Sequence, residues 1–423
     1  MCPDHGQVFT APSDHLLARR MSTADPELRA RVAAAWGLLL GQADEIADSI
    51  TEQLFKHDGE SYDRVGPELQ ADVRQSTRVH IRRGLEVLSE TDVAGTVTKE
   101  LWRETGRRRA RQGVPMELVL SAYTLGSRIL WQNLLEKSQE TSIDDDILLE
   151  AGQAVWAALD VQSAVMIEGY RRESARLQRQ DLQRQQSILD ALVEGRGADP
   201  EFGADAREAL GVSADDTIAS VVALYDAALE EPLSPAEDRL ERLGIASFWH
   251  VRAGVYFGLL AGPLPDERGL VELFTPHATG RVGVASSPEG IAGFATAFQL
   301  AARAAETLPR GQRAVVSVAE RLPEVLLAGS PQIAPLLLAQ TVGPLLAQPR
   351  SHARTLVLTL AALLRHDGSP THAAAELYCH RNTVIYRMKQ IEQLTGRKLS
   401  DPRDKLMLGL GLMAVPPDQQ DQG

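Results

Sequence analysis

Ser369-Pro-Thr-His-Ala-Ala-Ala-Glu-Leu-Tyr-Cys-His-Arg-Asn-Thr-Val-Ile-Tyr-Arg-Met-Lys-Gln-Ile-Glu-Gln-Leu-Thr-Gly396 decides the fold of the C-terminal part of this chain. Pro370 suits the first position of a helix because its missing N–H would be unpaired there anyway, and the Ser369 hydroxyl can accept from first-turn amides. The small Ala373 and Ala374 allow a second helix to cross closely, after a tight turn at residues 378–380. The stretch therefore predicts a helix-turn-helix.

The second helix is expected from about Arg381 to Leu394, with one apolar and one polar side. The apolar stripe comprises Val384, Met388 and Ile391, with Ile385 at its margin. The opposite side carries hydrogen-bonding side chains with cations beside them, as in a helix that enters a DNA major groove. We expect groove contacts from Asn382, Thr383, Tyr386 and Lys389, and phosphate contacts from Arg381 and Arg387. The alternative is an ordinary amphipathic surface helix.

Charge is distributed unevenly along the chain. The segment from Arg350 to Gly411 holds ten Lys and Arg residues against five Asp and Glu, whereas the whole chain has a net charge of −13. A basic segment at one end of an otherwise acidic protein concentrates the attraction for phosphate there. The charge pattern favours double-stranded DNA as the partner of this segment.

The motif His380-Arg-Asn-Thr-Val-Ile-Tyr-Arg-Met388 resembles the signature of PucR/CdaR-type bacterial transcription regulators. The similarity extends upstream through residues 355–369 and downstream through residues 391–406, so about sixty residues match in order. The resemblance implies a C-terminal DNA-binding domain. This chain departs from the pattern at Ile385, where many relatives carry arginine, and at Cys379 in the turn.

Length and composition set the outer bounds of the fold. A chain of 423 residues with 24% charged and 44% hydrophobic residues is typical of a soluble protein of two to four domains. No apolar run reaches the roughly 20 residues of a membrane span, and the N-terminus lacks the pattern of a secretion signal, so a cytoplasmic location is expected. Only Cys2 and Cys379 occur, and the ten histidines lack zinc-site spacing. Neither a disulfide nor a bound metal or cofactor is expected.

Residues 24–166 show apolar residues at helical spacing, which predicts a helical bundle. The passage from Leu101 to Trp131 resembles the N-terminal domain of RsbR-type stress regulators, which implies sensing or partner contact. The basic run Arg107-Arg-Arg-Ala-Arg111 is interpreted as a solvated helix face paired with Glu100 and Glu104, with a second nucleic-acid patch as the alternative. The aromatic residues of this region are expected mainly in the core, with a ligand pocket as the alternative: Trp102, Tyr123, Trp131 and Trp156.

Residues 167–195 are rich in arginine and glutamine and nearly free of glycine. Ala175, Leu182 and Leu189 recur every seven residues, which indicates an imperfect heptad seam. The segment is predicted to be a linker helix, either in a short parallel coiled coil or as a single solvated helix.

Residues 196–330 change to a strand-rich pattern, with strands expected at 217–225, 248–251, 255–260, 280–284 and 314–318 and helices at 235–243 and 290–307. The order βαβββαβ resembles the degenerate GGDEF-like domain of the PucR/CdaR family. The predicted hairpin turn, Arg252-Ala-Gly254, has no carboxylate to hold a cation, so catalysis is not expected. Asp226 after the first strand is interpreted as a strand-end cap.

Together these patterns predict a multidomain α and α+β protein that is not an enzyme. Its expected parts are a tail (1–23), a helical sensory or interaction domain (24–166), the linker helix (167–195), the GGDEF-like domain (196–330), a helix-turn-helix domain (331–415) and a second tail (416–423). The expected function is sequence-specific DNA binding by a homo-oligomeric, effector-responsive transcription regulator, because one small helix-turn-helix makes few base contacts. The alternative is a stress-signalling scaffold that acts through the N-terminal domain.

Overall fold

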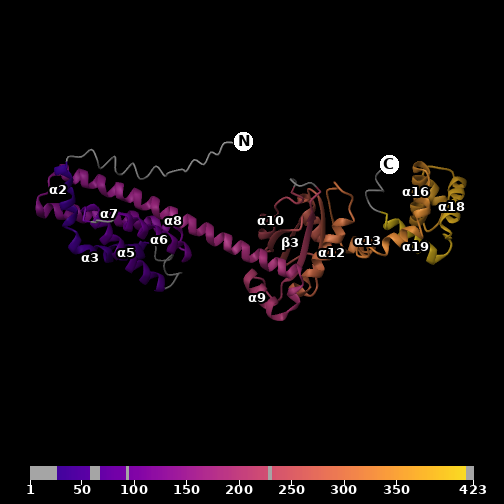
Figure 1. Ribbon diagram of the computed structural model, residues 1–423, viewed down its shortest axis with the longest axis horizontal. Coiled ribbons are helices and arrows are strands. Elements are labelled where there is room, and N and C mark those ends of the chain that lie inside the picture. Colours follow the sequence, from indigo (N-terminus) through magenta and orange to yellow (C-terminus); the bar gives the residue numbers. More distant parts are fainter. Residues whose placement is uncertain (1–25, 58–66, 92–94, 227–230, 416–423) are drawn as a thin grey trace, which may run out of the picture. The chain divides into compact units, whose positions relative to one another are not determined.

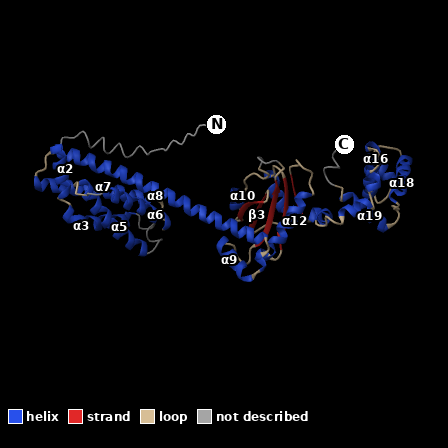
Figure 2. Ribbon diagram, viewed as in Figure 1, coloured by secondary structure: helices blue, strands red, loops and turns tan. Residues whose placement is uncertain are grey.

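The computed structural model describes residues 26–57, 67–91, 95–226 and 231–415, so both predicted tails lie outside the described residues. The chain divides into two compact units, Met1–Asp181 and Leu182–Gly423 (Figure 1). Helices dominate the first unit and the C-terminal part of the second, and the strands form one sheet (Figure 2). The predicted fold class, multidomain α and α+β, is confirmed.

The first unit is the predicted helical bundle. Its elements are α2 (Pro26–Gly37), η1 (Leu40–Gln42), α3 (Ala43–His57), α5 (Pro67–Leu88), α6 (Gly95–Arg111), α7 (Met116–Thr141) and the beginning of α8 (Asp145–Val193). The core is built from apolar side chains of α2, α3, α5 and α7, which include the fully buried Trp36, Ile50, Leu85 and Leu134. These side chains recur at the 3.6-residue spacing from which the helical bundle was predicted.

Two glycines set the closest approach of α6 and α8. A Cβ atom at Gly106 would overlap the carbonyl oxygen of Met166 in α8, and a Cβ atom at Gly169 would overlap that of Arg103 in α6. Next to this contact, the Tyr170 hydroxyl donates to the Val114 carbonyl over 2.9 Å. The two backbones therefore pack at a distance that only glycine permits.

The basic run in α6 is only partly the solvated face that we expected. Arg107 forms ion pairs with Glu100 and Glu104, as predicted. Arg109 is instead buried, with 5% of its surface exposed, and binds Asp72 of α5. The prediction was wrong for Arg109 because its partner lies 37 residues earlier in the sequence, on a helix that packs against α6.

Helix α8 runs without a break through residues 167–193 of the predicted linker and ends two residues before its predicted end, and it belongs to both units. Of the three residues in the proposed heptad seam, Ala175 and Leu182 are exposed, whereas Leu189 is buried in the core of the sheet domain. Formation of a coiled coil with another chain stays a prediction.

The second unit begins with η2 (Arg196–Ala198) and α9 (Pro200–Leu210), which precede a five-stranded sheet. The strands are β1 (Thr217–Leu224), β2 (Ala246–Arg252), β3 (Val255–Gly262), β4 (Arg281–Ser287) and β5 (Ala314–Ser317), in the spatial order β2-β3-β1-β4-β5. All neighbouring pairs are antiparallel except β4 and β5. The central β1 is buried on both faces, which explains its continuous apolar sequence.

Helices cover both faces of this sheet. Helix α12 (Phe294–Glu306), preceded by η4 (Gly290–Gly293), packs on one face, where Ile218 and Val222 of β1 point. On the other face, α10 (Glu237–Arg242) and α11 (Glu267–Phe274), followed by η3 (Thr275–His277), pack against Val221. The predicted elements are present. The structure adds α9 before β1 and α11 between β3 and β4, two helices that the sequence pattern did not predict.

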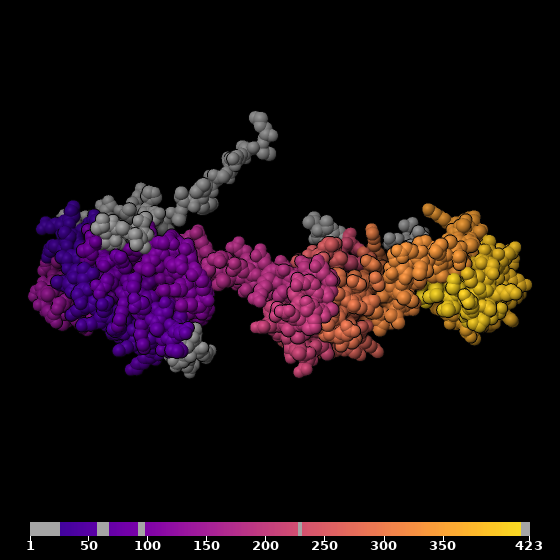
Figure 3. Space-filling view, turned by 60° about the horizontal axis from the view of Figure 1, so that its bottom comes forward, coloured from indigo at the N-terminus to yellow at the C-terminus, as the bar shows by residue number. Residues whose placement is uncertain are grey.

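The C-terminal part of the second unit is helical throughout. Its elements are η5 (Ala319–Arg321), α13 (Leu322–Ala328), α14 (Ala334–Ala339), α15 (Gly343–Leu346), α16 (Arg350–Arg365), α17 (Pro370–Glu376), α18 (Arg381–Thr395) and α19 (Pro402–Met413). In the space-filling view the surface is continuous from the sheet domain to these helices (Figure 3). In the parts of the chain that the structure describes, no helix has the length and apolarity to cross a membrane.

Candidate nucleic-acid interface

The first helix of the predicted motif, α17, begins at Pro370 as expected. The Ser369 side chain makes no capping hydrogen bond, so its predicted capping role was wrong. After α17, the Cys379 N–H donates to the Ala374 carbonyl over 3.1 Å, and Tyr378 adopts a left-handed φ of 49°. This closes the chain into the tight turn that the motif requires, and it leaves the Tyr378 side chain 96% exposed.

The second helix of the predicted motif, α18, is capped at both ends by residues next to it in the sequence. At its start, the Asn382 N–H donates to Nδ1 of His380 over 3.2 Å, a cap that the sequence reading missed. At its end, Gly396 has a left-handed φ of 67°, and its N–H donates to the Glu392 carbonyl. A ring nitrogen two residues before a helix N–H is an unusual cap, whereas glycine is the ordinary residue after a helix C-terminus.

The inward side of α18 matches the predicted stripe. Val384 and Ile391 are fully buried in a cluster with side chains of α16 and α17, and Met388 packs against this cluster. Ile385 is partly buried, in keeping with its place at the margin. The apolar side therefore fixes the orientation of α18 on the rest of the domain.

The outward side of α18 carries the residues predicted to contact DNA. Arg381, Asn382 and Lys389 are exposed, and Tyr386 is 63% exposed. Thr383 and Arg387 are partly buried. Gln390 Nε2 donates to the Tyr386 hydroxyl over 3.3 Å, which restricts the tyrosine ring along the helix. The fold thus brings the six predicted residues onto one helix, but it does not itself test their contacts.

The acidic side chains of this domain are all engaged in bonds within it. Glu376 binds Arg365 and His366, and hydrogen bonding to Arg365 lowers the pKa of its carboxyl group. Asp367 pairs with Lys405, and Asp404 accepts from the Lys398 N–H and from Arg397. The remaining two accept backbone N–H groups, Glu392 from Leu399 and Asp401 from Asp404.

The cations of α18 have no such partners. In the described part of the chain, Arg381, Arg387 and Lys389 take part in no ion pair, whereas Arg365, His366, Arg397 and Lys405 of the same domain each pair with an acid. The acids of the domain are each bonded to neighbouring groups, and the cations of α18 add positive potential to its outward side. This arrangement fits a polyanion such as a phosphodiester backbone.

The sheet domain has no comparable site for nucleotide chemistry. Asp226 binds Arg281 through both carboxylate oxygens and accepts the Gly311 N–H, so it joins the end of β1 to β4 and the approach to β5. Burial alone would raise the pKa of this carboxyl group, but these hydrogen bonds hold it lowered. The hairpin turns through Ala253 and Gly254, both with positive φ. Within the described residues, no cluster of three His, Cys, Asp or Glu side chains could hold a metal ion.

Comparison with protein families divides the chain into three parts. Residues 44–185 match the RsbT co-antagonist protein rsbRD N-terminal domain, residues 194–307 match the GGDEF-like domain, and residues 356–414 match the PucR C-terminal helix-turn-helix domain. The resemblance to PucR/CdaR-type proteins is therefore confirmed in all three of its parts.

Similar proteins share shorter stretches with this chain. An uncharacterized protein in the pkwA 5'region of Thermomonospora curvata is 44% identical over 18% of this chain and 42% of its own length. The purine catabolism regulatory protein of Bacillus subtilis is 39% identical over 16% of this chain and 13% of its own length. The carbohydrate diacid regulator of Escherichia coli is 38% identical over 16% of this chain and 19% of its own length. The chain thus covers less than half the length of each of these relatives.

Proposed function

Because the chain combines the three domains found in PucR/CdaR-type regulators, we propose that it is a sequence-specific DNA-binding transcription regulator. The observation that carries the proposal is the charge arrangement of the C-terminal domain, in which every acid is bonded internally and, within the described residues, the cations of α18 form no ion pair. Two similar proteins are named as regulators, which supports the same function.

In this proposal α18 enters the major groove with its N-terminal end toward the base edges. Asn382, Thr383, Tyr386 and Lys389 contact the groove, and Arg381 and Arg387 contact phosphates on either side. The Asn382 side chain can bind adenine through two hydrogen bonds, which makes it the residue on which sequence discrimination depends most. Ile385 is partly buried and apolar, so it adds no phosphate contact at the position where many relatives carry arginine.

We further propose that the chain acts as a homo-oligomer in the cytoplasm and carries no catalytic activity of its own. Pairing two copies doubles the number of base contacts and lets the protein read two half-sites. In the GGDEF-like domain, Asp226 is occupied by Arg281, which supports a structural rather than a metal-binding role. The N-terminal domain is the proposed receiver of a small-molecule effector.

The test is a fluorescence-anisotropy titration of the full chain against DNA upstream of its own gene, with random duplex as competitor. Asn382→Ala combined with Lys389→Ala is the test variant, and Tyr378→Ala, in the exposed turn outside α18, is the matched control. We expect competitor-resistant binding by the parent and the control, and none by the double variant. Binding by the parent that random duplex displaces completely would refute sequence-specific recognition.

The match of residues 44–185 to a domain of stress-regulator antagonists favours a second candidate function. In that case the N-terminal domain binds a protein partner, and the chain acts as a signalling scaffold. Co-purification of a stoichiometric partner by residues 26–181 in the absence of DNA, together with failure of the DNA titration, would favour the scaffold.

A further inference from the structure

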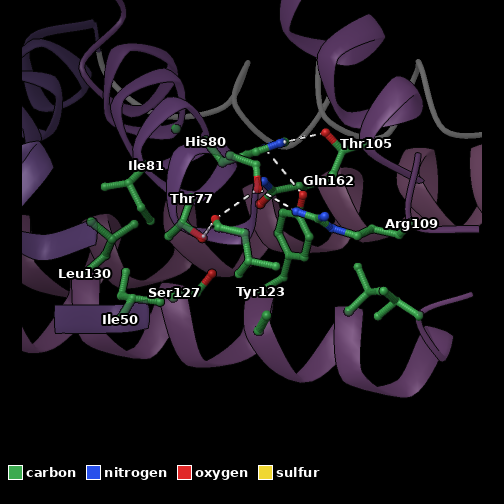
Figure 4. A pocket seen from close by; sticks show the side chains of 17 residues that line it. Ile50, Thr77, His80, Ile81, Thr105, Arg109, Tyr123, Ser127, Leu130 and Gln162 are labelled. Atoms are coloured by element: carbon green, nitrogen blue, oxygen red, sulfur yellow. Dashed lines mark hydrogen bonds between the residues drawn. The ribbon is translucent and has the colours of Figure 1, made fainter. Parts of the chain in front are cut away.

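The N-terminal bundle contains a cavity of about 90 Å³ between its helices. Side chains from α3, α5, α6, α7 and α8 line it, and Tyr123 is the one member of the aromatic set considered above that does so. Ile50, Ile81 and Leu130 gather at one end, and Thr105 and Arg109 lie toward the other (Figure 4). The cavity thus has an apolar end and a polar end, as binding sites for small organic molecules do.

The polar end is held by a chain of ordered hydrogen bonds. His80 Nε2 lies 2.8 Å from the Thr105 hydroxyl, and His80 Nδ1 lies 3.4 Å from the Tyr123 hydroxyl. The Thr105 hydroxyl donates onward to the Leu101 carbonyl, so His80 Nε2 carries the proton and Nδ1 accepts from Tyr123. Burial lowers the pKa of His80 to about 3, with the nearby Arg109 and Arg108 adding to the effect. The histidine is therefore neutral at physiological pH, and of the described residues that line the cavity only Arg109 is charged.

Within the described residues, the Arg109 guanidinium makes three hydrogen bonds, fewer than its donors allow. Its Nη1 donates to Asp72 and Gln112, and its Nη2 donates to the Ser76 hydroxyl over 2.6 Å. A guanidinium has five N–H groups, so two donors of this buried side chain have no acceptor among the described residues. The Asp72 carboxylate is also shared with Arg108, so the three charges sum to +1. These two N–H groups are therefore available to an acceptor from outside the chain.

Gln162 of α8 adds a second free polar group to the cavity lining. Within the described residues, its side chain makes no hydrogen bond. An amide N–H in the same cavity lining as a guanidinium is suited to the second oxygen of a carboxylate. Among the described residues that line the cavity, none has an acidic side chain to oppose such a ligand.

We infer that this cavity binds a short-chain monocarboxylate, with the carboxylate on Arg109 and Gln162 and the hydrocarbon tail against Ile50, Ile81 and Leu130. The size agrees with a tail of a few carbons, because a cavity of about 150 Å³ is known to hold benzene. A phosphate ester fits less well, since a dianion would face a single net positive charge. The claim that this ligand controls a transcription regulator rests on the proposed function. The claim that the cavity binds a carboxylate does not.

The test is isothermal titration calorimetry of the full chain, without DNA, against the sodium salts of propionate, isobutyrate and isovalerate and against the matching amides. We expect saturable binding of at least one carboxylate, and affinity at least tenfold lower for its amide, which has the same shape but no charge. Equal affinity for acid and amide, or no binding by any of the three salts, would overturn the inference.

Gly126→Ala is the variant that fills the cavity. The added methyl group would stand 3.7 Å from the Ile81 side chain and 3.9 Å from that of Ile50, so it occupies the apolar end without overlap. Gly37→Ala is the matched control, because its methyl group would meet only Ser89 at 3.9 Å, away from the cavity. We expect Gly126→Ala to weaken carboxylate binding at least tenfold and Gly37→Ala to leave it unchanged. Unchanged binding by a folded Gly126→Ala variant would show that the ligand lies elsewhere.

Because calorimetry is done without DNA, its outcome is independent of the proposed function. If the chain binds carboxylate but not DNA, the binding site is supported and the proposed function as a regulator is refuted. If the chain binds DNA but no carboxylate, the proposed function is supported and the binding site is refuted.

Discussion

Replacing Arg381 and Arg387 together with alanine is expected to reduce the salt dependence of DNA binding without unfolding the domain. Both side chains lack ion-pair partners in the described part of the chain, so no buried acid is left uncompensated when they are removed. Alanine also has a high helix propensity, so α18 is retained.

The size of the effect follows from counterion release. Each phosphate contact contributes about 0.9 to the slope of log affinity against log salt, so two contacts contribute about 1.8 per chain. Between 50 and 200 mM salt, the parent should then lose about twelve times more affinity than the double variant. The assay is an anisotropy titration at four salt concentrations in that range.

Arg172→Ala combined with Arg268→Ala is the matched control for net charge. It removes two exposed arginines, which pair with Glu168 and Glu272 outside the C-terminal domain. The control should keep the parent slope. If both double variants lose the same amount of salt-dependence slope, overall charge rather than contacts from α18 governs binding. If neither variant loses slope, Arg381 and Arg387 do not contact phosphates.

Three further outcomes are expected. Asn382→Ala should cost about 1–3 kcal/mol of discrimination between cognate and random duplex while leaving the salt slope unchanged, because the amide reads bases rather than phosphates; competition titrations measure both. Gly169→Ala should destabilise the N-terminal bundle by about 1–3 kcal/mol through overlap with the Arg103 carbonyl, whereas Gly84→Ala, whose Cβ meets nothing within 4 Å, should not; thermal unfolding of the two variants decides. Burial lowers the pKa of His80 to about 3, below its unfolded value of about 6.5, so only the unfolded chain takes up this proton and stability should fall as pH drops from about 6.5 to 3, by about 5 kcal/mol at most; His80→Gln should flatten the pH profile in urea unfolding, and parallel profiles would contradict the assignment.

The helix-turn-helix could be predicted from the sequence because its signals are local. Pro370 marks the start of α17, Gly396 marks the end of α18, and Val384 and Ile391 lie on the side that the 3.6-residue period places inward. The capping of α18 by His380 was missed, since histidine is rarely a cap. The serine before α17 had a favourable capping propensity, but its side chain makes no capping hydrogen bond.

The features of the N-terminal bundle were less predictable because they depend on residues far apart in sequence. The burial of Arg109 depends on Asp72 and Ser76 of another helix. The cavity likewise requires five helices to meet, and of the aromatic residues considered for it, Trp102 is buried in the protein and Trp156 is 45% exposed. Periodicity indicates which side of a helix is buried, but it does not indicate which polar groups meet inside.

The paired glycines of α6 and α8 limit how this protein can be made more stable. Replacing helix glycines with alanine is a standard way to raise thermostability, since each exchange restricts the unfolded chain. Here the rule divides the glycines of one bundle: Gly84 and Gly126 have room for a methyl group, and Gly106 and Gly169 do not. A procedure that replaces all four glycines with alanine would gain stability at Gly84 and Gly126. At Gly106 and Gly169 it would push α6 and α8 apart.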